Sequence, residues 1–231
     1  MQSEPYRELL LGCGHRRKRF IDPYPLYQAR ANLFYAARLV SEPERWQNVT
    51  TVDMNPSCDP DLVLDLSRTL WTIDPPAVKR LQPEVLEEIE GGDYQLKADT
   101  FDEVHAYEVL EHLGRSGDYE TYFAQFDEIW RVLRPGGFFC ATVPSRFSIW
   151  AWGDPGHSRI INEASLIFLF RPHYETAIGS GPSSDYRSVY SGDFDIIYTF
   201  DNETTFSFVL QAVKPARKAK QEYETLDSHR P

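Results

Sequence analysis

The sequence has few cysteines and no long apolar run. Three cysteines, Cys13, Cys58 and Cys140, occur among 231 residues; they cannot all pair and show no CxxC spacing, which fits a reduced compartment. No apolar stretch is long enough to cross a bilayer, and the polar start Met1–Pro5 lacks the apolar core of a signal peptide. We therefore expect a cytoplasmic protein that makes no membrane contact.

Basic side chains are also scarce relative to acidic ones. The chain has 24 Lys and Arg against 35 Asp and Glu, a formal net charge of −11. Such a surface repels a phosphate backbone, so we expect no nucleic-acid partner. Hydrophobic residues make up 42% of the chain, which indicates a folded protein. We expect one domain over residues 1–215, with an insertion at about 70–96, and a polar tail over 216–231.

Apolar residues follow the spacing of strands in some segments and the spacing of helices in others. Helical spacing occurs over Pro25–Val40 and Asp118–Leu133, and a short acidic helix is predicted at Pro83–Glu90 in the insertion. The predicted strands are Arg7–Leu11, Val49–Asp53, Pro60–Leu64, Phe101–Tyr107 and Phe138–Val143, followed by a hairpin of Phe194–Phe200 and Phe206–Val213. This order predicts an α/β fold with a mostly parallel sheet flanked by helices and a C-terminal antiparallel hairpin.

A glycine loop and an acid mark one end of this sheet. The run Leu9-Leu10-Leu11-Gly12-Cys13-Gly14 is a strand that ends in two glycines, which let the backbone approach a ligand closely. Asp53 ends the next strand, where a carboxylate can accept hydrogen bonds from ribose hydroxyls. Thirty-nine residues separate Gly14 from Asp53, compared with about 20 in the dinucleotide pattern.

Two further blocks complete a pattern. They are Phe101–Leu113 (FDEVHAYEVLEHL) and Arg131–Gly137 (RVLRPGG). Together with the glycine loop, Asp53 and the run Asp61–Leu66, and in this order, they resemble the class I S-adenosylmethionine-dependent methyltransferases. The resemblance covers roughly residues 8–145. It implies a Rossmann-like sheet, S-adenosylmethionine as cofactor, and methyl transfer to an oxygen or nitrogen of a small-molecule or glycan-like acceptor.

The resemblance also implies roles for residues of the first two loops. Gly12, Cys13 and Gly14 are expected to line the methionine end of the cofactor, mainly through their backbone. Asp53 is expected to hold the ribose hydroxyls, with Met54 beside the adenine.

Further roles follow for the later loops. Asp65 and Leu66 are expected at the edge of the adenine, and Glu108 near the methionine part and the transferring methyl. His157, in a segment similar to the family's DPxHxR stretch, is a candidate general base because the imidazole pKa lies near working pH. With Glu108 it forms the predicted catalytic pair.

The remaining histidines and aromatics are ambiguous. His112 is interpreted as structural, whereas Trp150, Trp152 and Tyr107 are candidates for the wall of an acceptor pocket. The run His15–Arg19 is either a basic rim at the cofactor or a solvated loop. The histidines show no paired spacing on a helix, so we predict no metal site.

An alternative hypothesis remains open. The family often has an acid where this chain has Leu10, and a third glycine where it has Arg16. A non-catalytic cofactor-binding or structural module that retains the fold would explain both departures. A nicotinamide oxidoreductase is disfavoured by the missing third glycine.

Overall fold

The computed structural model describes residues 5–22, 38–39 and 46–218, apart from Thr69, Leu81 and Gly179. Most of the helix predicted over Pro25–Val40 and most of the predicted tail lie outside the described residues. Arg38–Leu39 forms the short strand β3, which pairs with β2 (Ile21–Asp22), so these two residues are not the last turn of a helix.

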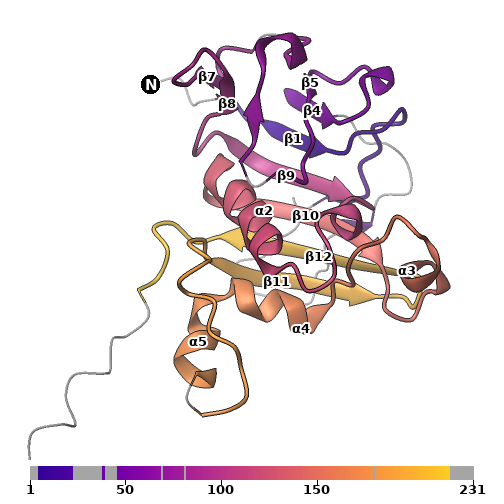
Figure 1. The fold of residues 1–231 in the computed structure, drawn as a ribbon, viewed down its shortest axis with the longest axis vertical. Helices are drawn as coiled ribbons and strands as arrows, with labels where there is room; N and C mark the ends of the chain where they lie inside the picture. Colours follow the sequence, from indigo (N-terminus) through magenta and orange to yellow (C-terminus); the bar gives the residue numbers. More distant parts are fainter. Residues whose placement is uncertain are drawn as a thin grey trace, which may run out of the picture.

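A seven-stranded sheet runs through the middle of the molecule (Figure 1). Its order is β11-β12-β10-β9-β1-β4-β5. The strands are β1 (Glu8–Leu11), β4 (Val49–Asp53), β5 (Leu62–Val63), β9 (Phe101–Tyr107), β10 (Leu133–Pro144), β11 (Phe194–Asp201) and β12 (Thr205–Ala212).

The directions of the strands confirm the predicted fold class. Strands β5, β4, β1, β9 and β10 are parallel to their neighbours, whereas β12 is antiparallel to both β10 and β11. The hairpin of β11 and β12 therefore adds one reversed strand to an otherwise parallel Rossmann-like sheet. Strands β4 and β9 have the bounds that the sequence predicted.

Helix α2 (Tyr119–Val132) begins and ends where the sequence indicated. Asp118 caps it by accepting a 3.0 Å hydrogen bond from the Thr121 N–H. Phe123, Phe126 and Ile129, spaced by three residues, are buried against the sheet. The remaining helices are short: α3 (Ile149–Gly153), α4 (Glu163–Leu166), α5 (Arg171–Ala177), η1 (Pro56–Cys58), η2 (Pro75–Ala77), η3 (Leu110–His112) and η4 (Ile167–Leu169).

One predicted boundary and one predicted helix were wrong. Strand β10 begins at Leu133, five residues before the predicted Phe138, because Leu133 already adopts extended backbone angles and pairs with Phe101. The acidic helix predicted at Pro83–Glu90 is absent. In its place β7 (Leu86–Glu88) joins β8 (Tyr94–Leu96) and β6 (Thr72–Ile73) in a small antiparallel sheet, since the Gly91-Gly92 turn folds β7 back onto β8.

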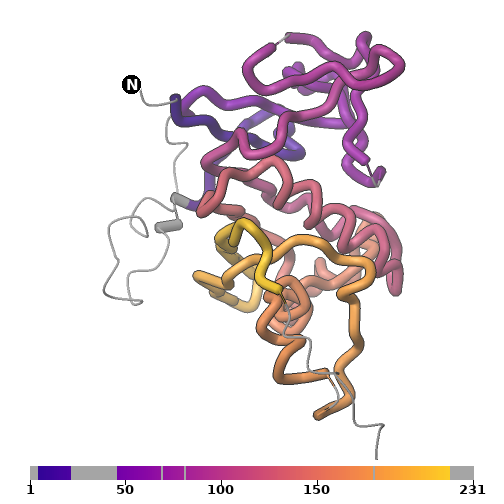
Figure 2. Tube along the Cα trace, turned by 90° about the vertical axis from the view of Figure 1, so that its left-hand side faces the viewer, coloured from indigo at the N-terminus to yellow at the C-terminus, as the bar shows by residue number. Residues whose placement is uncertain are grey.

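The two faces of the large sheet carry separate apolar clusters. Alternate residues of β1 divide between them, with Leu9 and Leu11 in the larger cluster and Leu10 in the smaller. Figure 2 shows the small sheet at one end of the molecule and α5 at the other. Among the described helices, none is both long and apolar enough to cross a membrane.

Candidate cofactor and acceptor site

The predicted site residues follow strands that end at the same edge of the sheet. Gly12 follows β1, Asp53 is the last residue of β4, and Asp65 and Glu108 lie in the loops after β5 and β9. Because these four strands are parallel neighbours, their carboxyl ends form one edge. Ligands of open α/β sheets bind at such an edge.

The glycine loop after β1 requires glycine at two positions for different reasons. Gly12 has φ +59°, and a Cβ there would lie 2.3 Å from a methyl carbon of Val109. Gly14 has φ +51°, and no described atom lies within 4 Å of a Cβ built there. Both angles lie in the left-handed region that glycine adopts without strain. The first glycine thus permits close packing onto the loop after β9, and the second leaves its backbone accessible to a ligand.

Asp53 joins this loop to the end of β4. Its Oδ2 accepts a 2.9 Å hydrogen bond from the Gly14 N–H, and its Oδ1 accepts a 2.8 Å bond from the Asn55 N–H. Each carboxylate oxygen can accept a second bond, so the side chain is fixed in position and can still bind hydroxyl groups. Met54 beside it is 69% exposed, which suits a side chain that covers a flat ring.

The loop after β5 places its two predicted residues differently. Asp65 Oδ1 accepts hydrogen bonds from the N–H and hydroxyl of Ser67. These bonds lower the carboxyl pKa of Asp65 below its usual value, so it is charged at neutral pH. Leu66, in contrast, is buried in the larger apolar cluster, which leaves its backbone as the part available at an adenine edge.

Cys13 does not supply a reactive thiol. Its side chain is buried in the smaller apolar cluster, and its N–H donates a 3.0 Å hydrogen bond to the Val52 carbonyl. Burial, together with the charge of Asp53, raises the pKa of the thiol to about 11. The thiol is therefore neutral at physiological pH, and Cys13 contributes through its backbone.

Glu108, directly after β9, is held in an unfavourable backbone conformation. Its φ is +55°, rare for a residue with a Cβ, and its N–H donates a 2.8 Å hydrogen bond to the Thr142 carbonyl. Burial of the carboxyl raises the pKa of Glu108, although a hydrogen bond with Thr142 and the nearby His157 and His112 act in the opposite direction. Strain of this kind concentrates at functional sites, and here it turns an acid toward the edge of the sheet.

The segments after β9 and β10 bring a second acid and two histidines together. His112 Nε2 and His157 Nε2 each lie 4.0 Å from Glu111 Oε1, and the two imidazole rings meet edge to face with centroids 4.6 Å apart. Burial raises the pKa of the Glu111 carboxyl to about 8. We call Glu111, His112 and His157 the Glu–His cluster. The sequence pattern points to His157 but not to Glu111. The one feature that could have indicated Glu111 is that it is a charged residue inside an apolar block.

A pocket of about 440 Å³ lies next to this cluster. The segment after His157 connects them, because the Ser158 N–H donates to the Glu111 carbonyl at 2.7 Å and Arg159 Nε donates to the Leu113 carbonyl at 2.8 Å. The pocket is lined by aromatic rings with polar groups between them: Arg115, Ser116, Gly117, Asp118, Tyr119, Tyr122, Phe123, Trp152, Arg159, Ile160, Ser165, Phe168 and Tyr186. Of the three aromatic candidates from the sequence, only Trp152 lines it.

Tyr107, one of the candidates for a pocket wall, belongs to the core. Its side chain is buried, and its hydroxyl contacts His105 Nδ1 at 2.7 Å and accepts a 3.2 Å hydrogen bond from the Ile21 N–H. Since the direction of Tyr107 alternates with that of Ala106, it points to the smaller apolar cluster on the sheet face.

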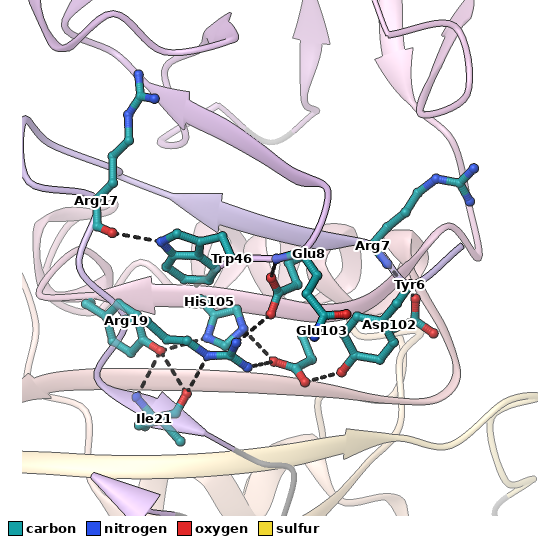
Figure 3. A network of polar contacts seen from close by, with 12 residues as sticks. Tyr6, Arg7, Glu8, Arg17, Arg19, Ile21, Trp46, Asp102, Glu103 and His105 are labelled. Carbon is teal, nitrogen blue, oxygen red and sulfur yellow. Dashed lines mark hydrogen bonds and ion pairs between the residues drawn. The ribbon is translucent and has the colours of Figure 1, made fainter. Parts of the chain in front are cut away.

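The basic run His15–Arg19 divides between surface and interior. Arg19, which is 7% exposed, extends beneath the sheet, where its guanidinium pairs with Glu8 at 2.8 Å and Glu103 at 2.6 Å (Figure 3). His105 Nε2 lies 2.8 Å from the same Glu103 carboxylate. Burial alone would raise the pKa of Glu103, but the hydrogen bond with His105 and the nearby charges lower it. Arg19 thus holds its loop against the sheet and does not belong to a basic rim at the cofactor.

These residues fit the cofactor that the sequence predicts. Gly14 leaves room for a ligand over its backbone, and Asp53 presents a positioned carboxylate for hydroxyl groups. Met54 and Asp65 lie along the same edge, on the side of β4 and β5. Leu10, which replaces an acid of the family pattern, is buried and makes no polar contribution.

Comparison with known protein families gave one match. The sequence model described as "Methyltransferase domain" matches residues 62–141, from β5 into β10. No curated protein is similar enough in sequence to count as a relative.

Several solved structures are similar to this chain at low sequence identity. A SAM-dependent methyltransferase from Archaeoglobus fulgidus is 14% identical, covering 90% of this chain and 87% of its own, with a TM-score of 0.43. The N-methyltransferase NodS from Bradyrhizobium japonicum, in complex with S-adenosyl-L-homocysteine, is 12% identical (90% and 78% covered, TM-score 0.42). A 16S rRNA (adenine(1408)-N(1))-methyltransferase from Catenulisporales acidiphilia is 13% identical (93% and 87% covered, TM-score 0.41). At these values no neighbour identifies an acceptor.

Proposed function

We propose that this chain, a class I S-adenosylmethionine-dependent methyltransferase, transfers the methyl group to an oxygen or nitrogen of a small or polar acceptor, a metabolite or a sugar-like compound. The match of residues 62–141 to a methyltransferase domain supports the family and the enzyme class that the sequence predicted, and with them S-adenosylmethionine as the cofactor. The acceptor and the residue roles below are our proposal.

The observation that carries this proposal is the pocket beside the Glu–His cluster. Its volume, about 440 Å³, lies within the range of small-molecule sites. Aromatic rings can stack on the flat or apolar face of an acceptor, while Arg115 and Arg159 supply polar edges. The net charge of −11 disfavours a long phosphate backbone as partner. A nucleic-acid acceptor, such as the rRNA of one structural neighbour, is the competing possibility.

Cofactor binding is assigned to the loops after β1, β4, β5 and β9. In this assignment Gly12, Cys13 and Gly14 line the methionine end through their backbone, and Asp53 accepts hydrogen bonds from the ribose hydroxyls. Met54 covers the adenine. The Gly14 N–H bond to Asp53 supports this arrangement, because it fixes the ribose-binding carboxylate relative to the glycine loop.

The adenine edge and the reacting end complete the assignment. Asp65 accepts from the exocyclic amine of the adenine, and the backbone of Leu66 lies beside it. Glu108 lies at the methyl end, between cofactor and acceptor. When bound, S-adenosylmethionine supplies a methyl group already activated on a sulfonium.

Catalysis then requires little beyond positioning and proton removal. The pocket holds the acceptor in line with the methyl group and excludes water, which accounts for most of the rate enhancement. Glu108, directly after β9 at the carboxyl edge of the sheet, takes the proton from the acceptor. His157 has a side chain only 8% exposed, so we assign it a positioning role beside Glu108.

An acceptor screen tests the proposal. Purified protein is incubated with radiolabelled S-adenosylmethionine and panels of hydroxylated metabolites, amines, sugars and RNA. We expect label in a small compound. Glu108→Gln should lower the turnover rate about 100-fold or more, whereas Glu175→Gln, exposed on α5, should leave it unchanged. Label in RNA alone would contradict the acceptor class, and no transfer to any acceptor despite cofactor binding would favour the non-catalytic module.

A further inference from the structure

The Glu–His cluster contains a buried carboxylate that no described side chain neutralises. Glu111 is 2% exposed, and neither of its carboxylate oxygens has a hydrogen-bond partner. A buried carboxylate without partners is costly, and proteins normally compensate it with a cation or hydrogen bonds. The nearest basic atoms, His112 Nε2 and His157 Nε2, lie 4.0 Å away, beyond hydrogen-bonding distance. The arrangement thus leaves space between the acid and both rings.

His112 is oriented as a metal ligand is. Its Nδ1 lies 3.1 Å from the Gly156 carbonyl, which can only accept, so Nδ1 carries the proton. The free lone pair therefore belongs to Nε2, the ring nitrogen that lies 4.0 Å from Glu111 Oε1. Histidines that bind metals commonly donate their other N–H to a backbone carbonyl in this way, which fixes both the tautomer and the ring.

His157 completes the set from a different segment. Its Nε2 also faces Asp154 Oδ2 at 3.9 Å, and its buried Nδ1 has no hydrogen-bond partner. One ligand atom from each of Glu111, His112 and His157 lies within 4.8 Å of the others. Around an ion with bonds of about 2.0–2.2 Å, ligand atoms lie about 3.3–3.6 Å apart. Each imidazole Nε2, now 4.0 Å from Glu111 Oε1, therefore needs to approach that oxygen by about half an ångström.

The other acid and histidine cluster of the described residues provides a contrast. Glu8, Glu103 and His105 lie equally close together, but there the Arg19 guanidinium pairs with both carboxylates. That cluster already has its cation. The Glu–His cluster has none of the described arginines or lysines in a salt bridge with Glu111.

We propose that Glu111, His112 and His157 bind a divalent transition-metal ion, with two imidazole nitrogens and one carboxylate as ligands. This donor set suits Zn²⁺, Mn²⁺, Co²⁺ or Ni²⁺ better than Mg²⁺, which prefers oxygen ligands. The side chain of His112 is 45% exposed, so an ion can enter from that side. The spacing of the histidines does not reveal this set, because His157 is 45 residues from His112 and only the fold brings them together.

Three protein ligands leave at least one coordination position open. That position can hold water or, if the proposed function is correct, an oxygen of the acceptor next to Glu108. A lone pair of His157 that binds the ion cannot accept a proton, which agrees with the positioning role assigned to it. Binding of the ion itself does not depend on the proposed function.

Calorimetric titration of the chelator-treated protein with ZnCl₂, MnCl₂ and MgCl₂, without cofactor or acceptor, tests the site. We expect one equivalent of Zn²⁺ to bind at micromolar affinity or tighter, and Mg²⁺ at least 100-fold more weakly. Glu111→Gln and His112→Ala should each weaken Zn²⁺ binding by 10-fold or more. His173→Ala serves as the matched control, because His173 lies outside the cluster and contacts Ser183.

A second measurement keeps the result clear if a variant is poorly folded. His112→Ala changes a half-exposed side chain and should unfold within a few degrees of the wild type without metal. Zn²⁺ should raise the Tm of the wild type and of His173→Ala, but not that of His112→Ala. The proposal is overturned if folded wild type binds none of the transition metals, or if folded His112→Ala and Glu111→Gln bind Zn²⁺ as tightly as the control.

Discussion

The Gly14 N–H donates a 2.9 Å hydrogen bond to Asp53 Oδ2, although 39 residues separate them in the sequence. This bond ties the loop after β1 to the end of β4 and orients the carboxylate along the edge of the sheet. The residues between them, most of which lie outside the described part, do not alter this relationship. The spacing between Gly14 and Asp53 is longer than in the dinucleotide pattern, yet the glycine loop and the carboxylate still meet at the strand ends.

The two loop glycines should respond differently to substitution. A Cβ at Gly12 would collide with Val109, whereas a Cβ at Gly14 meets no described atom. We expect Gly14→Ala to cost about 1–2 kcal/mol of folding free energy, because only its φ is unfavourable. Gly12→Ala should cost more. Urea denaturation measures both.

A double variant separates the collision from the strain. Val109→Ala removes the methyl carbon that lies 2.3 Å from the added Cβ, so it should recover part of the stability lost in Gly12→Ala. It should give no recovery in Gly14→Ala. Cofactor affinity provides a second readout, and Gly14→Ala is expected to weaken it while remaining folded. Equal stability losses in the two single variants would contradict this account of the loop.

Arg19 should make a large contribution to the stability of the fold. Its guanidinium is the cation between the buried carboxylates of Glu8 and Glu103. Arg19→Met would leave both acids buried without it, at a cost of about 3–5 kcal/mol. Lys18→Met, an exposed position in the same loop, should change stability by less than about 0.5 kcal/mol. Urea denaturation of the two variants checks this, and similar values for both would refute the role of Arg19.

Asp127 should make stability depend on pH between about 4 and 6. Its Oδ1 accepts hydrogen bonds from the Ser191 N–H at 3.0 Å and the Gly192 N–H at 2.6 Å, but burial still raises its pKa to about 6. Because the folded state then binds the proton more tightly than the unfolded state, the wild type loses stability as pH rises through this range.

Asp127→Asn keeps an oxygen acceptor but cannot ionise, so it should lack this loss. Between pH 4 and pH 7, the unfolding free energy of the wild type should fall by about 1–2 kcal/mol relative to that of Asp127→Asn. This value allows for the partial exposure of the carboxyl. Asp74→Asn, an exposed position, is the control. A pH-independent difference for Asp127→Asn would show that the carboxyl titrates normally.

The fold could be predicted because its signals are local. Strand β9 reads as alternating apolar residues, and α2 begins at a capping aspartate and carries an apolar stripe, so both bounds followed from the sequence. The small sheet of β6, β7 and β8 was missed because Leu86–Glu88 pairs with residues beyond the turn. Pairing between strands is not visible in the composition of one segment.

The site could be predicted only as far as each residue follows a strand. Asp53 ends β4 and Glu108 directly follows β9, so their placement at one edge was foreseeable. The Glu–His cluster was not, since it depends on Ser158 donating to the Glu111 carbonyl, which folds the loop after β10 onto the segment after β9. Likewise, Tyr107 and Arg19 lie in segments whose sequence suggested a place in the site, but the structure buries both side chains.

Calorimetric titration with S-adenosylmethionine and S-adenosylhomocysteine tests the central claim most directly. The wild type should bind both at micromolar affinity, and Asp53→Ala should weaken binding by at least 10-fold while remaining folded. Asp74→Ala, which removes the same charge from an exposed position without a side-chain cap bond, should bind like the wild type. Absence of binding by folded wild type, or full affinity in Asp53→Ala, would contradict the cofactor site at this edge of the sheet.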